Sequence, residues 1–248
     1  MKRAEKLLVS ILLAASTFGA TAQAASAYTG DVWSNSDAFS STCLGFTDTY
    51  PQQLYSLATS QMAILGYAPV AGRLGSGFTR SAFLTNVFYD YAVYAHTHAD
   101  NYWAPYPRVD SAILQDPGVG RCNTSADRIY SSSIKASTMG TPSNLVIMST
   151  CKLGSTSSTM PDAFQIAKTK ASTRREFYLS YVNLTYDSSQ LRIERAFWSY
   201  LNGAALHTRT AYQAFTYAMS IGGYSSPDSA DPFQPNWWGN PNYNGTAG

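Results

Sequence analysis

Segments that read as β-strands alternate with segments that read as helices along most of this chain. The clearest strands are the apolar runs 90–95 and 145–148, and helical periodicity marks 52–65 and 190–201. This alternation predicts an α/β domain in which a mostly parallel sheet is flanked by helices. In such sheets the chemistry gathers at the carboxyl ends of the strands. The residues that follow 90–95 and 145–148 are therefore the first candidates for a functional site.

Shorter patterns predict the remaining elements. Further strands are expected at 31–35, 67–73 and 177–182, and further helices at 81–88, 161–170 and 204–219. The stretch 101–142 is rich in Pro, Ser, Asp and Gly, and we expect it to be irregular. The predicted organisation is a signal segment over 1–24, one α/β domain over 25–224 and an irregular Pro/Asn/Trp-rich tail over 225–248.

The first 24 residues have the features of a secretory signal peptide. Three basic residues stand near the N-terminus, an apolar run covers 7–18, and the small-x-small sequence Ala22-Gln23-Ala24 follows. The apolar run is shorter than the roughly 20 residues that a permanent membrane helix needs. We therefore expect a secreted or periplasmic protein, of bacterial type, with no membrane contact after the signal is removed.

Export changes the charge of the chain. The full sequence has 17 basic and 15 acidic side chains, and the signal segment carries three basic residues and one acidic residue, which leaves 14 of each. A neutral chain is a poor match for nucleic acid, which binds proteins largely through positive charge. We therefore expect no nucleic-acid partner.

Three cysteines, Cys43, Cys122 and Cys151, occur in the chain, all beyond the signal segment. An odd number in an exported protein leaves at least one thiol without a partner in the same chain. Cys43 and Cys122 lie in polar, loop-like sequence, whereas Cys151 ends an apolar run. We predict a disulfide between Cys43 and Cys122, and a free thiol at Cys151.

The two selected strand ends carry a cysteine and two histidines, the residue types from which thiol active sites are built. His96-Thr97-His98-Ala99-Asp100 follows the first strand, and Ser149-Thr150-Cys151 follows the second. A thiol becomes a strong nucleophile when a nearby imidazole removes its proton and later returns it. Adjacent parallel strands would bring these residues together. The simpler alternative is a buried cysteine and hydrogen-bonded histidines with no chemical role.

The same residues resemble the caspase-like fold of cysteine peptidases, the group that contains caspases, gingipains, clostripain, separase and the bacterial CHAT domains. In that family a buried strand ends in the catalytic His, commonly followed by Gly, and a second strand ends in the catalytic Cys about fifty residues later. Here 55 positions separate His96 from Cys151. The segment NLVIMSTCKLG resembles the bacterial form of the Cys strand, which commonly has Gly three residues after the Cys.

The resemblance implies a role for each of these residues. Cys151 would be the nucleophile and His96 the general base and acid, with His98 as the alternative base. The backbone N–H groups of Cys151 and Thr97 would stabilise the oxyanion. The implied function is a secreted cysteine peptidase or related thiol hydrolase that acts on a peptide or protein substrate without a cofactor. Thr97 stands where the family usually has Gly, so a catalytically inactive caspase-like binding module is an alternative.

A zinc-dependent hydrolase is the other enzymatic hypothesis. His96, His98 and Asp100 open the HxHxDH pattern of metallo-β-lactamase-type enzymes, in which imidazole nitrogens bind zinc. Asn101 replaces the last His of that pattern, and His207 is the only further histidine in the chain. The zinc hypothesis leaves Cys151 without a role. Under any of these hypotheses, the sequence does not predict an oligomeric state.

Overall fold

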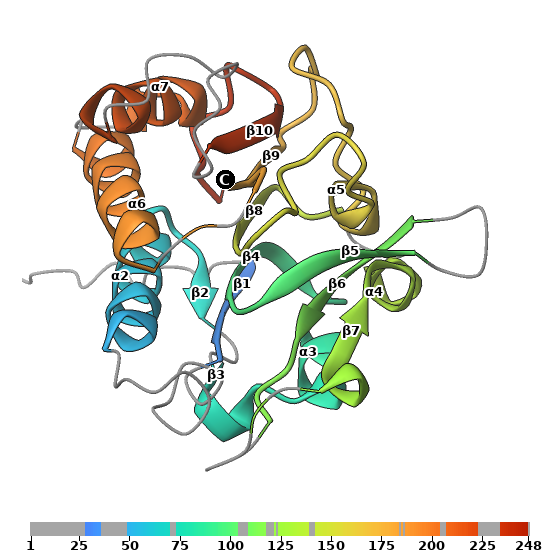
Figure 1. Ribbon diagram of the computed structural model, residues 1–248. Coiled ribbons are helices and arrows are strands. Elements are labelled where there is room, and N and C mark those ends of the chain that lie inside the picture. The colour runs from blue at the N-terminus through green and yellow to red at the C-terminus, as the bar shows by residue number, and fades with distance from the viewer. Residues whose placement is uncertain are drawn as a thin grey trace, which may run out of the picture.

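The computed structural model describes residues 28–35, 49–69, 73–103, 109–117, 122, 124–138, 142–183, 185, 187–203, 207–222 and 234–247. Within these residues a seven-stranded sheet forms the centre, in the order β10-β9-β8-β4-β1-β2, and β3 also pairs with β1. All of its described pairs are parallel except that of β10 with β9. Helices pack on this sheet, and a small antiparallel sheet lies beside it (Figure 1). The predicted α/β class with a mostly parallel sheet is confirmed.

The main sheet contains β1 (Thr29–Ser34), β2 (Ala68–Pro69), β3 (Arg73–Leu74), β4 (Asp90–His96), β8 (Leu145–Ser149), β9 (Phe177–Tyr181) and β10 (Pro235–Gly239). The described strands of the small sheet are β5 (Ala99–Trp103), β6 (Val109–Leu114) and β7 (Arg128–Tyr130). The α-helices are α2 (Tyr50–Ile64), α3 (Arg80–Asn86), α4 (Ser131–Thr138), α5 (Met160–Ala163), α6 (Asp187–Asn202) and α7 (Ala211–Gly222). Short 3₁₀ turns occur at η2 (Gly75–Gly77) and η3 (Ser125–Asp127).

Two apolar cores cover the two faces of the main sheet. Tyr94 and Ile147 belong to the core under α2, α6 and α7, whereas Val93 and Val146 belong to the core under α3, α4 and α5. Successive side chains of a strand point to opposite faces, so a strand covered on both faces must be apolar throughout. This is why β4 and β8 were recognisable as continuous apolar runs. The strands predicted at 31–35, 90–95, 145–148 and 177–182, and the helices at 52–65, 81–88 and 190–201, are confirmed within a few residues.

The sequence predicted an irregular stretch at 101–142, and this prediction is wrong for much of the described part of the stretch. The stretch contains most of β5, all of β6 and β7, and α4. Three of their apolar residues, Ile113, Ile129 and Ile134, are fully buried in the second core. Charged and polar residues interrupt the short strands of this stretch, and strand character at such positions depends on partners supplied by the fold.

Three further element predictions need correction. The helix expected at 161–170 is only the single turn of α5, because Gln165 adopts a left-handed φ of 59° just after it. The helix expected at 204–219 begins at Ala211, since His207 has a φ of 48° and the Thr210 hydroxyl accepts the N–H of Gln213 at 3.1 Å. The strand expected at 67–73 appears as the short strands β2 and β3, with 70–72 outside the described residues.

The expected irregular tail contains an ordered edge strand. Pro235 opens β10, a position where proline's missing N–H costs no sheet hydrogen bond. Trp237 stacks on Phe177 with ring centroids 5.5 Å apart, and Trp238 packs on Tyr178 at 5.6 Å. The two adjacent tryptophans therefore contribute one to each core, and β10 covers the edge of β9.

The predicted signal peptide falls within residues 1–27, which lie outside the described residues. Export therefore remains a prediction. None of the helices in the described ranges combines the length and the apolar character that crossing a bilayer requires.

Candidate functional site

The two strand ends selected from the sequence lie side by side. β4 and β8 are adjacent and parallel, with His96 opposite Ser149. The segments that follow them leave the sheet at the same edge and contact each other there. Lys152 Nζ lies 2.9 Å from Asp100 Oδ2, and the Asn101 side-chain amide donates to the carbonyl oxygen of Lys152 at 3.2 Å. The expected juxtaposition of the histidine segment and the cysteine segment is thus present.

Cys151 is a partly buried thiol and is free among the described residues, as predicted. Its sulfur accepts the backbone N–H of Thr185 at 3.4 Å. Burial raises the pKa of the thiol; the Thr185 N–H opposes this effect, and the nearby carboxylate of Asp187 adds to it. At neutral pH the resting group is therefore a neutral thiol, and it needs a base in order to react.

His96 is held in the interior by groups other than the thiol. Its side chain is 1% exposed, and Nε2 lies 3.2 Å from Asp187 Oδ1. Nδ1 lies 3.3 Å from the hydroxyl of Ser34, which donates to the carbonyl oxygen of Pro51 at 3.2 Å. These contacts join the ends of β1 and β4 to the starts of α2 and α6. Both ring nitrogens of His96 therefore contact polar groups of neighbouring elements beneath the strand ends.

A buried carboxyl group lies on the same face of the sheet as the His96 ring. Glu194 of α6 is fully buried and accepts the hydroxyls of Tyr94 at 2.7 Å and Tyr181 at 3.3 Å. Burial raises the pKa of Glu194, while the hydroxyls that face it and the nearby His96 ring lower it. This cluster fixes α6 against the carboxyl ends of the strands.

Sequence reasoning missed Ser34, Asp187 and Glu194. Ser34 ends β1 and lies one residue before the end of the strand predicted at 31–35, so the strand-end rule would have pointed to it if applied to that strand as well. Asp187 begins α6, where an acidic residue is favoured by the helix dipole whatever its function. No sequence signal distinguished Glu194 from a surface glutamate.

Thr97 and His98 form the turn between β4 and β5. Thr97 is buried; its hydroxyl donates to the carbonyl oxygen of Leu114 at 2.6 Å and accepts the Asn35 amide at 3.3 Å. The carbonyl oxygen of His98 accepts the N–H of Leu114 at 3.0 Å, and the His98 side chain is only partly buried. Thr97 thus anchors the turn to β6, and His98 is the more accessible of the two histidines.

Gly154 brings the cysteine loop against the neighbouring strand. Its N–H donates to the carbonyl oxygen of Tyr181 at 2.7 Å. A Cβ at this position would lie 2.7 Å from the carbonyl carbon of Tyr181 and 2.8 Å from the carbonyl oxygen of Ser180. The close approach explains physically why a glycine stands three residues after Cys151.

The zinc hypothesis gains no support from the geometry. The His96 ring faces Asp187, and the carboxylate of Asp100 is paired with Lys152. In the described ranges no three or more His, Cys, Asp or Glu side chains are grouped so that they could hold a metal ion. His96, His98 and Asp100 are therefore not gathered as a ligand set.

The predicted disulfide remains a prediction. Cys122 belongs to the described residues, but Cys43 lies outside them. The structure thus establishes the free state of Cys151 but not the pairing of the other two cysteines.

Comparison with known proteins finds no family model that matches this chain and no matching curated protein. The resemblance to caspase-like peptidases therefore rests on the residues and motifs of the two strand ends. Any function must be argued from the site itself.

Proposed function

We propose that this protein is a secreted cysteine peptidase or related thiol hydrolase of caspase-like type, with Cys151 as the nucleophile. One observation carries the proposal. Two adjacent parallel strands place the segment that contains His98 against the segment that contains Cys151, and the two segments are joined by the 2.9 Å contact of Asp100 with Lys152. Carboxyl ends of neighbouring parallel strands are where α/β proteins assemble reactive groups.

We assign the general base to His98, the alternative in the sequence interpretation, in place of His96. A base must reach both the nucleophile and the leaving group of the substrate. His96 is almost completely buried, and its two ring nitrogens face Ser34 and Asp187. His98 is partly exposed and lies two residues before Asp100, which contacts the neighbour of Cys151. In this assignment His96 orients Asp187 at the start of α6.

The assignment also changes the expected oxyanion site. The residue after the base becomes Ala99, which is much closer in size to the usual Gly of the family than Thr97 is. Thr97 then has a structural role, through its hydrogen bonds to Leu114 and Asn35. Among the described residues no group accepts the backbone N–H of Cys151, and the proposal gives this N–H the role of oxyanion donor.

The proposed reaction is acyl transfer. His98 removes the thiol proton as the Cys151 sulfur attacks the substrate carbonyl carbon, and the backbone N–H of Cys151 donates to the resulting oxyanion. The protonated His98 then gives that proton to the leaving amine, which departs and leaves a thioester. Water, deprotonated by His98, attacks the thioester carbonyl; the acid product leaves and the thiol takes back its proton. The raised thiol pKa makes this base assistance necessary.

Four variants of the mature protein test the proposal with a mixed fluorogenic peptide library. Cys151→Ala should abolish hydrolysis, and His98→Ala should lower it by about 100-fold or more, the usual contribution of a general base. His207→Ala is the matched control and should leave the rate unchanged. Retained hydrolysis in Cys151→Ala would refute the thiol mechanism. A larger loss in His96→Gln than in His98→Ala, with both proteins folded, would return the base to His96.

A catalytically inactive caspase-like binding module is the second candidate. The raised pKa of Cys151 favours it, since a buried structural cysteine has the same property. A peptidyl acyloxymethyl ketone separates the two candidates, because it traps a thiol only where attack on a carbonyl-like centre is assisted. Labelling of Cys151 that depends on His98 supports the enzyme; alkylation by iodoacetamide without ketone labelling supports the binding module.

A further inference from the structure

We infer that Asn101 is a positioning residue for Cys151. Asn101 acts by holding Lys152, the residue that follows Cys151 in the chain, in a left-handed backbone conformation. The functional importance of Cys151 rests on the proposed function. The structural content of the inference, a mechanical link from Asn101 through Lys152 to the thiol, stands on the contacts described below.

Lys152 has a φ of 63°, one of the few positive φ values at a non-glycine residue in the described chain. Non-glycine residues adopt this region uncommonly, and they stay in it only where their surroundings hold them there. Here four contacts hold the residue. Its N–H donates to the carbonyl oxygen of Asn183 at 3.1 Å, and its Nζ contacts Asp100 at 2.9 Å. Its carbonyl oxygen accepts the backbone N–H of Ser155 at 3.1 Å and the Asn101 amide at 3.2 Å.

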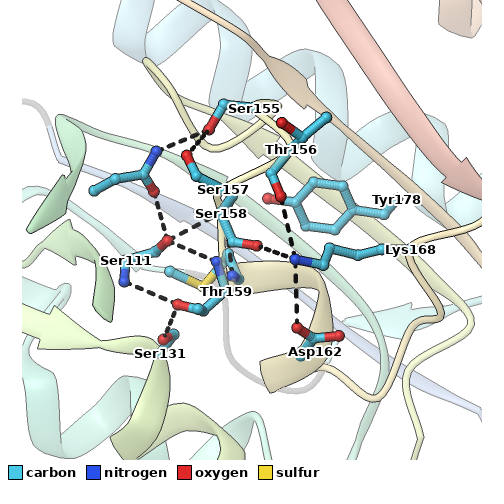
Figure 2. A network of polar contacts seen from close by, with 12 residues as sticks. Ser111, Ser131, Ser155, Thr156, Ser157, Ser158, Thr159, Asp162, Lys168 and Tyr178 are labelled. Atoms are coloured by element: carbon cyan, nitrogen blue, oxygen red, sulfur yellow. Dashed lines mark hydrogen bonds and ion pairs between the residues drawn. The ribbon is translucent and has the colours of Figure 1, made fainter. Parts of the chain in front are cut away.

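The Asn101 amide is itself fixed by its other contacts. Its oxygen accepts the Ser111 hydroxyl at 2.6 Å, so its nitrogen must face the acceptors on the cysteine loop. That nitrogen donates to the Ser155 hydroxyl at 2.8 Å as well as to Lys152. Ser111 in turn accepts the N–H of Thr159 at 2.9 Å, as part of the hydroxyl network that ties the loop to the small sheet (Figure 2). The orientation of the Asn101 amide is therefore fixed by contacts other than the one with Lys152.

The consequence for the thiol follows from the geometry of the chain. The φ of Lys152 sets the direction in which the backbone leaves Cys151, and so helps to keep the sulfur 3.4 Å from the Thr185 N–H. Removal of the amide takes away the one side-chain donor to the Lys152 carbonyl oxygen among the described residues. We then expect the backbone of Lys152 to shift toward the common negative φ region and the thiol to move outward into water. A more exposed thiol ionises more easily and reacts faster with alkylating agents.

Alkylation of Cys151 by iodoacetamide, followed by peptide mass spectrometry between about pH 6 and pH 10, measures this effect around the ordinary cysteine pKa. Asn101→Ala should raise the rate at pH 8 by about fivefold and lower the apparent pKa, because exposure relieves the burial of the thiol. Ser155→Ala is the matched control: it removes the other acceptor of the same amide and should change the rate less than about twofold. Identical pH profiles for Asn101→Ala and the wild type would overturn the inference.

A second background shows whether Asn101 acts through Lys152. Glycine adopts positive φ without strain, so in Lys152→Gly the Asn101 amide is no longer needed to keep this backbone conformation. There Asn101→Ala should change the alkylation rate by less than about twofold, whereas an equal effect in both backgrounds would refute the link. Alkylation needs only the thiol. Hydrolysis that survives Cys151→Ala would thus reject the proposed function, while the alkylation rates still decide the role of Asn101.

Discussion

Substitution of Gly154 by alanine tests how tightly the cysteine loop is fitted to the sheet. The new Cβ would lie 2.7 Å from the carbonyl carbon of Tyr181 and 2.8 Å from the carbonyl oxygen of Ser180. Both atoms belong to the backbone of β9, which pairs with β10 at these two residues and cannot turn away. The Asn236 amide, which donates to the carbonyl oxygen of Gly154 at 2.8 Å, restrains the loop as well. We therefore expect the loop, and Cys151 with it, to be displaced.

The size of the effect follows from the cost of overpacking. Extra methyl groups in a well-packed interior cost about 1–3 kcal/mol. In a domain of about 150–250 residues each kcal/mol lowers the melting temperature by about 2–4 °C, so Gly154→Ala should melt about 2–12 °C below the wild type. Circular dichroism measures the transition, and iodoacetamide alkylation of Cys151 measures the displacement of the thiol.

Gly77→Ala provides the matched control for Gly154→Ala. The three atoms nearest its Cβ would all belong to the side chain of Arg73, the nearest of them Cδ at 2.8 Å, and this exposed side chain can turn aside. The entropy effect on the unfolded chain is the same for both changes, so it cancels in the comparison. We expect Gly77→Ala to stay within about 2 °C of the wild type. If Gly154→Ala has the melting temperature and the alkylation rate of the wild type, the close fit of the loop is refuted.

Two further predictions concern pH. Alkylation of Cys151 should have an apparent pKa above the ordinary cysteine value of about 8.5, because burial raises the pKa of the thiol, and a midpoint well below that value would contradict this. Burial, aided by Asp31, also raises the pKa of Asp90. The stability that this retained proton contributes is complete below the unfolded pKa of about 4 and is lost as the pH rises. Asp90→Asn should therefore gain stability relative to the wild type between about pH 5 and 8, by up to about tenfold in the unfolding constant per pH unit, and a pH-independent difference in urea titrations would contradict it.

Local patterns were sufficient to predict the central strands and the two strand ends. β4 and β8 are covered on both faces, so each reads as an unbroken apolar run, and the residues after such runs fall at one edge of a parallel sheet. The contact between Asp100 and Lys152 bears out this reasoning. A free thiol at Cys151 was also foreseen from its place at the end of an apolar run.

Sequence patterns failed where an element depends on a distant partner. Prolines, which are typical of loops, occur within and beside β10 in the sequence. The strand nevertheless forms, and its Trp237 stacks on Phe177, which lies 60 positions earlier in the chain. The strands of the small sheet are short and are interrupted by charged and polar residues, and their pairing supplies the hydrogen bonds that local propensity does not predict. Such elements are decided by tertiary contacts.

The sequence by itself determined the α/β class, the main strands and the segments that meet at the site, because burial on both faces imposes a visible apolar pattern. It did not determine which of the two histidines is buried. His96 and His98 differ in exposure because His96 is held by Asp187, 91 positions away, and Thr97 is anchored to Leu114. Only the tertiary structure supplies those partners, since hydrogen bonds between distant residues leave no periodic trace in the chain.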